Sequence, residues 1–186
     1  FKEWRKHCGV VMQEGFIFGD TIANNIVPDG NMIDKKRLLY AVEMANIRDF
    51  VESLPLKYNT KIGNTGQGLS QGQKQRILIA RAIYRNPDYL FFDETFDGLD
   101  PVMRNFVKKL ICEDVLERGA SAIITSHSLR ELEDICDQLA LLHKGGLVLE
   151  SDIENLKTSQ FKIQIAFRGE YDKSKFQGIQ VSHYEK

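Results

Sequence analysis

The chain has 186 residues and a mass of 21.3 kDa, enough for one domain with at most a short appendage. Its 25 basic and 26 acidic side chains give a formal net charge of −1, so it lacks the basic excess of a nucleic-acid-binding domain. Cys8, Cys112 and Cys136 form no CxxC pair, which disfavours zinc and redox motifs. No apolar run approaches the ~18 residues that a membrane span needs. The start at Phe1, with no signal-peptide pattern, leads us to expect a piece of a longer polypeptide.

The first third of the chain predicts one buried strand and one helix. The apolar run Cys8–Met12 is typical of a strand that ends at Gln13. Asp34 is a good N-cap, and the apolar spacing after it predicts a single helix that extends to about Phe50. The glycine-rich segment 63–68 then predicts an open loop.

A second helix begins at Ser70. Ser70 and Gln73 have the spacing of a capping box, and apolar residues recur at helical intervals until Pro87. The continuous apolar run Tyr89–Phe92 follows, which predicts a parallel strand covered on both faces.

The rest of the chain continues this alternation. We expect a helix over 100–119, a buried strand over 120–125, a helix over 128–136 and a hairpin of strands within 139–150. Strands that alternate with helices in this way indicate a three-layer α/β domain with a mainly parallel core sheet. Residues 161–167 alternate strictly between apolar and polar, which suggests a half-exposed strand of a separate small unit.

The start of the second helix has the features of an anion site. A helix N-terminus offers unpaired amides and the positive end of a dipole to a phosphate. Gly72 lets the backbone approach closely, and Ser70 adds a hydroxyl donor. A capped amphipathic helix without a ligand would explain the capping box alone. The whole run Leu69–Ala82 favours the anion site.

Asp93 and Glu94 follow the strand Tyr89–Phe92, and open α/β sheets bind ligands at the carboxyl ends of their strands. One carboxylate there can hold Mg²⁺, and the next can orient or deprotonate an attacking water. Gln13 and His127 also follow predicted strands, and either could be a purely structural group. At the same edge, however, His127 could bond a γ-phosphate and Gln13 could contact Mg²⁺ or water.

Taken in their order along the chain, these motifs resemble those of the ABC ATPase family, and the resemblance covers about residues 5 to 155. Gln13 matches the Q-loop, Leu69–Gln73 the signature motif, Leu90–Asp93 Walker B, and Glu94 the catalytic glutamate. Asp100, in Gly98–Asp100, matches the D-loop, and His127 matches the switch histidine. The resemblance implies a partial P-loop NTPase (RecA-like) cassette over residues 1–157, with a helical signature subdomain at about 20–86. Residues 158–186 would begin a small β-containing accessory segment.

The resemblance also implies ATP and Mg²⁺ as cofactors and a head-to-tail dimer with a second cassette, identical or different. Asp93, Glu94, Gln13 and His127 would serve this subunit's nucleotide, with Asp93 and Gln13 at the metal. Ser70, Gln71, Gly72, Gln73 and Asp100 would contact nucleotide as well, with Ser70 and Gly72 facing the partner's ATP. Further partners would be transmembrane transporter domains, with the cassette at the cytoplasmic face of the membrane and no nucleic acid expected.

The pattern departs from the family in three places. The chain contains no GxxxxGK[ST], the loop that cradles phosphates, so we expect it to bind ATP weakly and not to hydrolyse it by itself. Gln71 stands where glycine is commoner, and Asn64 where exporters often have glutamate. Up to about Leu90 the chain looks like fused exporters, and after about Gly98 like cassettes made as separate ATPase subunits.

Two other functions remain open from the sequence. The first is a soluble ABC ATPase of the ribosome-associated type. A DNA-repair type is disfavoured, since only 55 residues separate Gln13 from Leu69 and leave no room for a long coiled coil. The second is a degenerate cassette that lends only its signature to a partner, although Asp93 and Glu94 argue against it.

Overall fold

A computed structural model describes residues 2–27, 32–63, 66 and 68–159 of the chain. It divides into two compact units, Phe1–Cys136 and Asp137–Lys186, and each is described by itself. Among the described residues, no helix combines the length and the apolar character that crossing a membrane requires.

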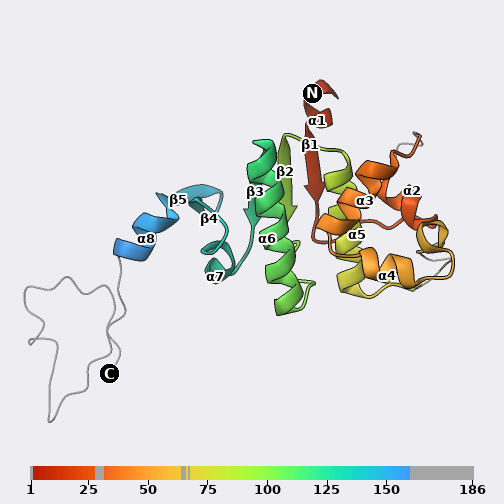
Figure 1. Cartoon of the computed structure of the whole chain (residues 1–186). Coiled ribbons are helices and arrows are strands. Elements are labelled where there is room, and N and C mark those ends of the chain that lie inside the picture. Colours follow the sequence, from red (N-terminus) through yellow and green to blue (C-terminus); the bar gives the residue numbers. More distant parts are fainter. Residues whose placement is uncertain (1, 28–31, 64–65, 67, 160–186) are drawn as a thin grey trace, which may run out of the picture. The chain divides into compact units, whose positions relative to one another are not determined.

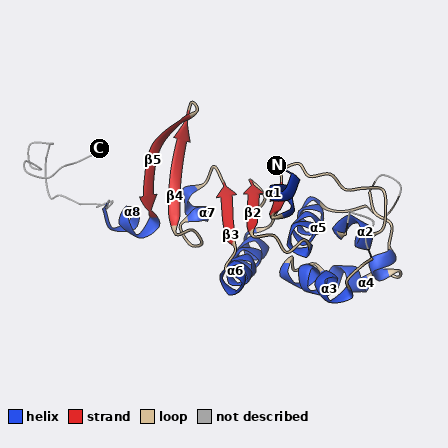
Figure 2. Ribbon diagram, turned by 90° about the horizontal axis from the view of Figure 1, so that it is seen from above, coloured by secondary structure: helices blue, strands red, loops and turns tan. Residues whose placement is uncertain are grey.

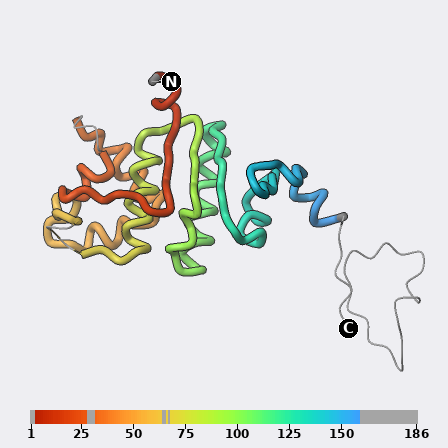
Figure 3. The backbone as a smooth tube through the Cα atoms, turned by 180° about the vertical axis from the view of Figure 1, so that it is seen from behind, coloured from red at the N-terminus to blue at the C-terminus, as the bar shows by residue number. Residues whose placement is uncertain are grey.

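The first unit is built on a three-stranded parallel sheet. β1 (Cys8–Val11), β2 (Tyr89–Asp93) and β3 (Ser121–Thr125) lie in the order β1-β2-β3, and their arrows point the same way in Figure 1. Figure 3 shows the first two strands side by side although they are far apart in the sequence. Because all three are parallel, their carboxyl ends share one edge, which confirms the predicted α/β class.

Only one face of this sheet is fully covered. Val11, Leu90 and Phe92 are buried in the core, against which α5 (Gln71–Tyr84) packs. Gly9 lies on the same face, and a Cβ there would stand 2.8 Å from Cγ of Pro87 and 3.2 Å from the carbonyl oxygen of Ala82, so the end of α5 and the residues after it leave no room for a side chain.

The opposite face was expected to be buried, and this expectation is wrong for the described chain. Val10 is 54% exposed and Ile123 is 57% exposed, while Phe91 is half-buried. Trp4, from the short helix α1 (Lys2–Lys6), meets Phe91 edge-on with ring centroids 6.3 Å apart. These side chains line an open apolar hollow, over which no other described element of the first unit lies. β3 has further exposure because it pairs on one side only.

A layer of helices lies beside the sheet and supplies most of the core (Figure 2). It comprises α2 (Ile22–Ile26), α3 (Lys35–Met44), α4 (Arg48–Ser53), the 3-10 turn Lys57–Asn59 and α5. The largest fully buried side chains of these elements and the loops that join them include Ile22, Ile26, Ile47, Ile62, Ile77 and Ile79.

The single helix expected from Asp34 to Phe50 is two helices. Asp34 caps α3 as predicted, accepting from the amides of Lys36 and Arg37. The helix ends because Asn46 adopts φ 48°, a left-handed conformation that asparagine tolerates better than most residues. Arg76, on α5, donates to the Asn46 carbonyl at 3.0 Å, so a distant side chain stabilises this corner.

α6 (Pro101–Arg118) begins at its cap Asp100 and buries two charged groups. Asp114 accepts hydrogen bonds from Arg118 and from the Tyr40 hydroxyl. Burial has the largest effect on the pKa of Tyr40 and the hydrogen bond to Asp114 the next largest, and together they raise it to about 12. α7 (Leu129–Leu132) stops four residues earlier than the predicted end at Cys136, and an ion pair joins its Glu131 to Arg104 of α6.

The second unit contains β4 (Gln138–His143), β5 (Gly146–Asp152) and α8 (Ile153–Ser159). The strands pair antiparallel, which confirms the predicted hairpin. Lys144 and Gly145 both have positive φ, at 50° and 78°, as a two-residue turn of this twist requires. The strand predicted over 161–167 lies outside the described residues, so the accessory segment at 158–186 stays a prediction.

Candidate functional site

The carboxyl edge of the sheet gathers the polar residues that the sequence placed at strand ends. β2 ends at Asp93, β3 ends at Thr125 beside it, and β1 ends two residues before Gln13. Buried Thr95 ties two of these ends together, since its hydroxyl donates to the Val11 carbonyl at 2.9 Å. The edge is therefore one continuous surface and not three separate loops.

Asp93 and Glu94 are held in place by the neighbouring strand. The Thr125 hydroxyl donates to Oδ1 of Asp93 at 2.7 Å. The Glu94 amide donates to the Thr125 carbonyl at 3.2 Å and to its hydroxyl oxygen at 3.2 Å. Glu94 has φ 44°, a conformation that is costly for a residue other than glycine and that turns the chain sharply out of the sheet.

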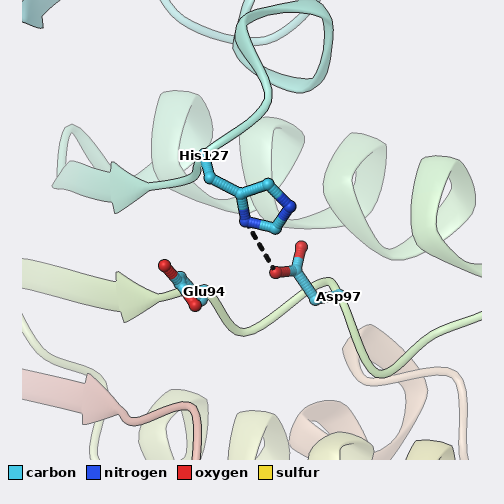
Figure 4. A group of neighbouring side chains, drawn as sticks. All are labelled: Glu94, Asp97 and His127. Atoms are coloured by element: carbon cyan, nitrogen blue, oxygen red, sulfur yellow. Dashed lines mark ion pairs between the residues drawn. The ribbon is translucent and has the colours of Figure 1, made fainter.

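Glu94, Asp97 and His127 form a cluster at this edge (Figure 4). One side-chain atom from each lies within 4.8 Å of the others, and Nδ1 of His127 is 3.4 Å from Oδ2 of Asp97. The imidazole is 73% exposed, so it is available to a ligand from solution. Asp97 was not predicted from the sequence, although its place between Glu94 and the Gly98 turn was a usable signal.

Gln13 is fixed through its main chain. Its carbonyl accepts a hydrogen bond from Nε2 of Gln75 at 3.2 Å, while its side chain is exposed. The structure therefore places Gln13 at the expected edge and leaves its amide available. Sequence reasoning missed Gln75, Thr95 and Thr125, because nothing in their spacing shows which loop each one holds.

The predicted anion site at the start of α5 has the expected capping box. The Ser70 hydroxyl oxygen accepts from the Gln73 amide, and Oε1 of Gln73 accepts from the Ser70 amide. Gln71 is exposed, so the helix start is open to solvent. A Cβ on Gly72 would come 3.4 Å from the Gly98 carbonyl, so the helix start lies against the turn that follows Glu94.

Asp100 is the N-cap of α6, at the position where the sequence predicted that this helix begins. Its carboxylate accepts from the Met103 amide at 3.0 Å and caps α6. Arg76 lies nearby on α5, where burial lowers its pKa and the charge of Asp100 opposes that shift. A nucleotide contact by Asp100 stays a prediction.

The donor set at the edge fits a magnesium–phosphate ligand. Oδ1 of Asp93 accepts the hydrogen bond from Thr125, and within the described residues its Oδ2 has no hydrogen-bond partner. A carboxylate oxygen, the Gln13 amide oxygen and phosphate oxygens are the hard ligands that Mg²⁺ prefers. His127 adds a nearby group that can donate to a phosphate oxygen.

The family model described as "ABC transporter" matches residues 1–97, which is more than half of the chain. The chain belongs to the ABC transporter family. The match to the family model ends at residue 97, beside Gly98. The predicted change there, from exporter-like sequence to that of separate ATPase subunits, stays a prediction.

Curated ABC proteins resemble the chain over most of its length. ABC transporter B family member 15 of Arabidopsis thaliana is 40% identical over 149 residues, covering 77% of the chain and 12% of the relative. The ATP-dependent lipid A-core flippase of Saccharophagus degradans is 36% identical, covering 77% of the chain and 24% of the flippase. The chain therefore spans a small part of these proteins.

A solved ABC structure agrees with the fold. A bacterial Atm1-family ABC exporter with ATP bound superposes with a TM-score of 0.75 at 29% identity, covering 84% of this chain and 27% of that one. This likeness confirms the predicted fold class, a partial P-loop NTPase cassette with a parallel sheet and a helical signature region.

Proposed function

We propose that the chain is part of the ATP-binding and ATP-hydrolysing cassette of an ABC transporter, which drives a substrate across a membrane. The observation that carries this proposal is the shared edge of β1, β2 and β3, where Asp93 ends β2 and where Glu94, Asp97 and His127 form a cluster. Membership of the ABC family supports the choice of ATP as the nucleotide.

Each residue at the edge has a proposed role. Asp93 and Gln13 would hold Mg²⁺, which when bound neutralises charge on phosphate oxygens. Glu94 would orient and deprotonate the attacking water as general base. His127, paired with Asp97, would donate to the γ-phosphate and so detect it.

The open start of α5 is assigned to a second cassette. Ser70 and Gly72 would contact ATP held by that partner, with Gln71, Gln73 and Asp100 beside them. The Ser70 hydroxyl oxygen accepts within the capping box, so its own proton stays available for a phosphate. Transmembrane transporter domains would complete the assembly, with the cassette at the cytoplasmic face of the membrane.

Replacing the proposed general base tests this function. In the full-length protein, Glu94→Gln should lower the rate of ATP hydrolysis about 10²–10⁴-fold, the usual contribution of general-base catalysis, while ATP stays bound. Glu113→Gln on the exposed face of α6 is the control and should leave the rate unchanged. Unchanged turnover in Glu94→Gln would favour the degenerate cassette.

The isolated chain should neither bind ATP tightly nor hydrolyse it, because it contains no GxxxxGK[ST] loop. Titration with a labelled ATP analogue measures this. Micromolar affinity of the chain alone would contradict the prediction. A full gene with two signature motifs and no membrane spans would instead favour the ribosome-associated alternative.

A further inference from the structure

Gln75 is a buried polar side chain between two parts of the candidate site. It lies on α5, just after the signature residues Ser70–Gln73, and is 2% exposed. On one side, its Nε2 donates to the Gln13 carbonyl at 3.2 Å. On the other, its Cγ would be 3.2 Å from a Cβ placed on Gly98, so it packs directly against that turn.

The other half of the Gln75 amide is unsatisfied. Its Oε1 is buried and has no hydrogen-bond partner among the described residues. Leaving a buried acceptor unpaired destabilises a fold, whereas an apolar side chain of the same shape would avoid that cost. A glutamine here is therefore a poor choice for stability alone, and such trade-offs mark functional positions.

We propose that Gln75 is a positioning residue that links the Gln13 segment and the Gly98 turn to the signature helix. The inference rests on the proposed function, in which Gln13 serves the nucleotide of this subunit and Ser70–Gln73 serve that of the partner. Through Gln75, a shift of the main chain at Gln13 moves α5, and with it the signature. The residue thereby couples two nucleotide sites without touching either nucleotide.

The decisive variant is Gln75→Met in the full-length protein, which keeps the length of the side chain and removes both amide groups. We expect kcat for ATP hydrolysis to fall about tenfold, the rate equivalent of one hydrogen bond, with KM for ATP within about twofold. The melting temperature should stay the same or rise, since the unpaired Oε1 is gone. A purely structural role would instead lower the melting temperature and leave kcat per folded molecule unchanged.

Two further measurements complete the test. The ¹³C NMR shift of the Gln13 carbonyl, isotope-labelled at that position, should move upfield in Gln75→Met, because this carbonyl has lost its hydrogen-bond donor. Gln75→Glu replaces the donor by an acceptor at equal size and should show the same loss of kcat. The control is Gln138→Met on the exposed strand β4, which should change nothing.

The outcomes separate this inference from the proposed function. Wild-type kcat in both Gln75 variants, or an unchanged shift of the Gln13 carbonyl in Gln75→Met, would overturn the role of Gln75. A wild-type protein that hydrolyses no ATP would refute the proposed function, and the shift of the Gln13 carbonyl would still decide whether Gln75 holds the Gln13 segment.

Discussion

The helix α5 and the strand β3 are both rich in apolar residues, yet they differ in what covers them. Seven of the fourteen residues of α5 are buried, including Ile77 and Ile79. In β3 no residue is buried, and only Ile124 is half-covered. Helices of the same unit surround α5, whereas β3 has one neighbouring strand and an open face.

The difference shows that an apolar segment can be predicted to need burial, whereas its sequence does not show whether the rest of the chain buries it. The run Ala122-Ile123-Ile124 has the character of a strand covered on both faces, and the described chain covers neither face fully. The helix, in contrast, packs against α2, α3 and β1 of the same unit. Stability in this unit should therefore come from the helical layer and only weakly from β3.

A pair of isoleucine truncations tests this contrast most strongly. Ile79→Ala in α5 should lower the free energy of unfolding of the chain by about 2–5 kcal/mol, because it leaves a cavity in the core. Ile123→Ala in β3 should change it by less than about 0.5 kcal/mol. Urea denaturation of both variants measures the difference. Equal losses would mean that the open face of the sheet is buried in solution.

Substitutions at two helix N-caps compare the same regions, with a smaller expected change in unfolding free energy. Ser70→Ala removes the capping box of α5 and should cost about 1 kcal/mol of unfolding free energy. Ser128→Ala, at the start of α7 after β3, removes a residue with no side-chain cap bond and should cost almost nothing. The same denaturation assay compares them, and a larger loss in Ser128→Ala would reverse the contrast.

Tyr40 connects the helical layer to α6 and gives the subtlest effect. Its pKa of about 12 lies above the ordinary value of 10.0, so the unfolded chain loses this proton first as the pH rises. The stability that comes from this group is complete below pH ~10 and is lost as the pH rises through about 12. In a near-ultraviolet absorbance titration, Tyr40→Phe should remove a late-titrating tyrosine. Identical late steps in both proteins would contradict the assignment.

Local sequence patterns predicted the residues of the candidate site better than they predicted the residues that hold those side chains in place. Asp93 and Glu94 were found because two acids end an apolar run, and His127 because it follows another. Gln75 and Thr125 were missed because each acts on a residue more than 30 positions away. The helix break at Asn46 was missed for the same reason, since Arg76 of α5 bonds its carbonyl.

The sequence by itself determined the alternation of strands and helices, the caps at Asp34, Ser70 and Asp100, and the chemistry at each strand end. These depend on neighbours a few residues apart. Only the tertiary structure decided that Asp97 joins Glu94 and His127, and that one sheet face stays open. Such pairings depend on the parallel register and on which elements are present to cover a surface, and spacing along the chain specifies neither.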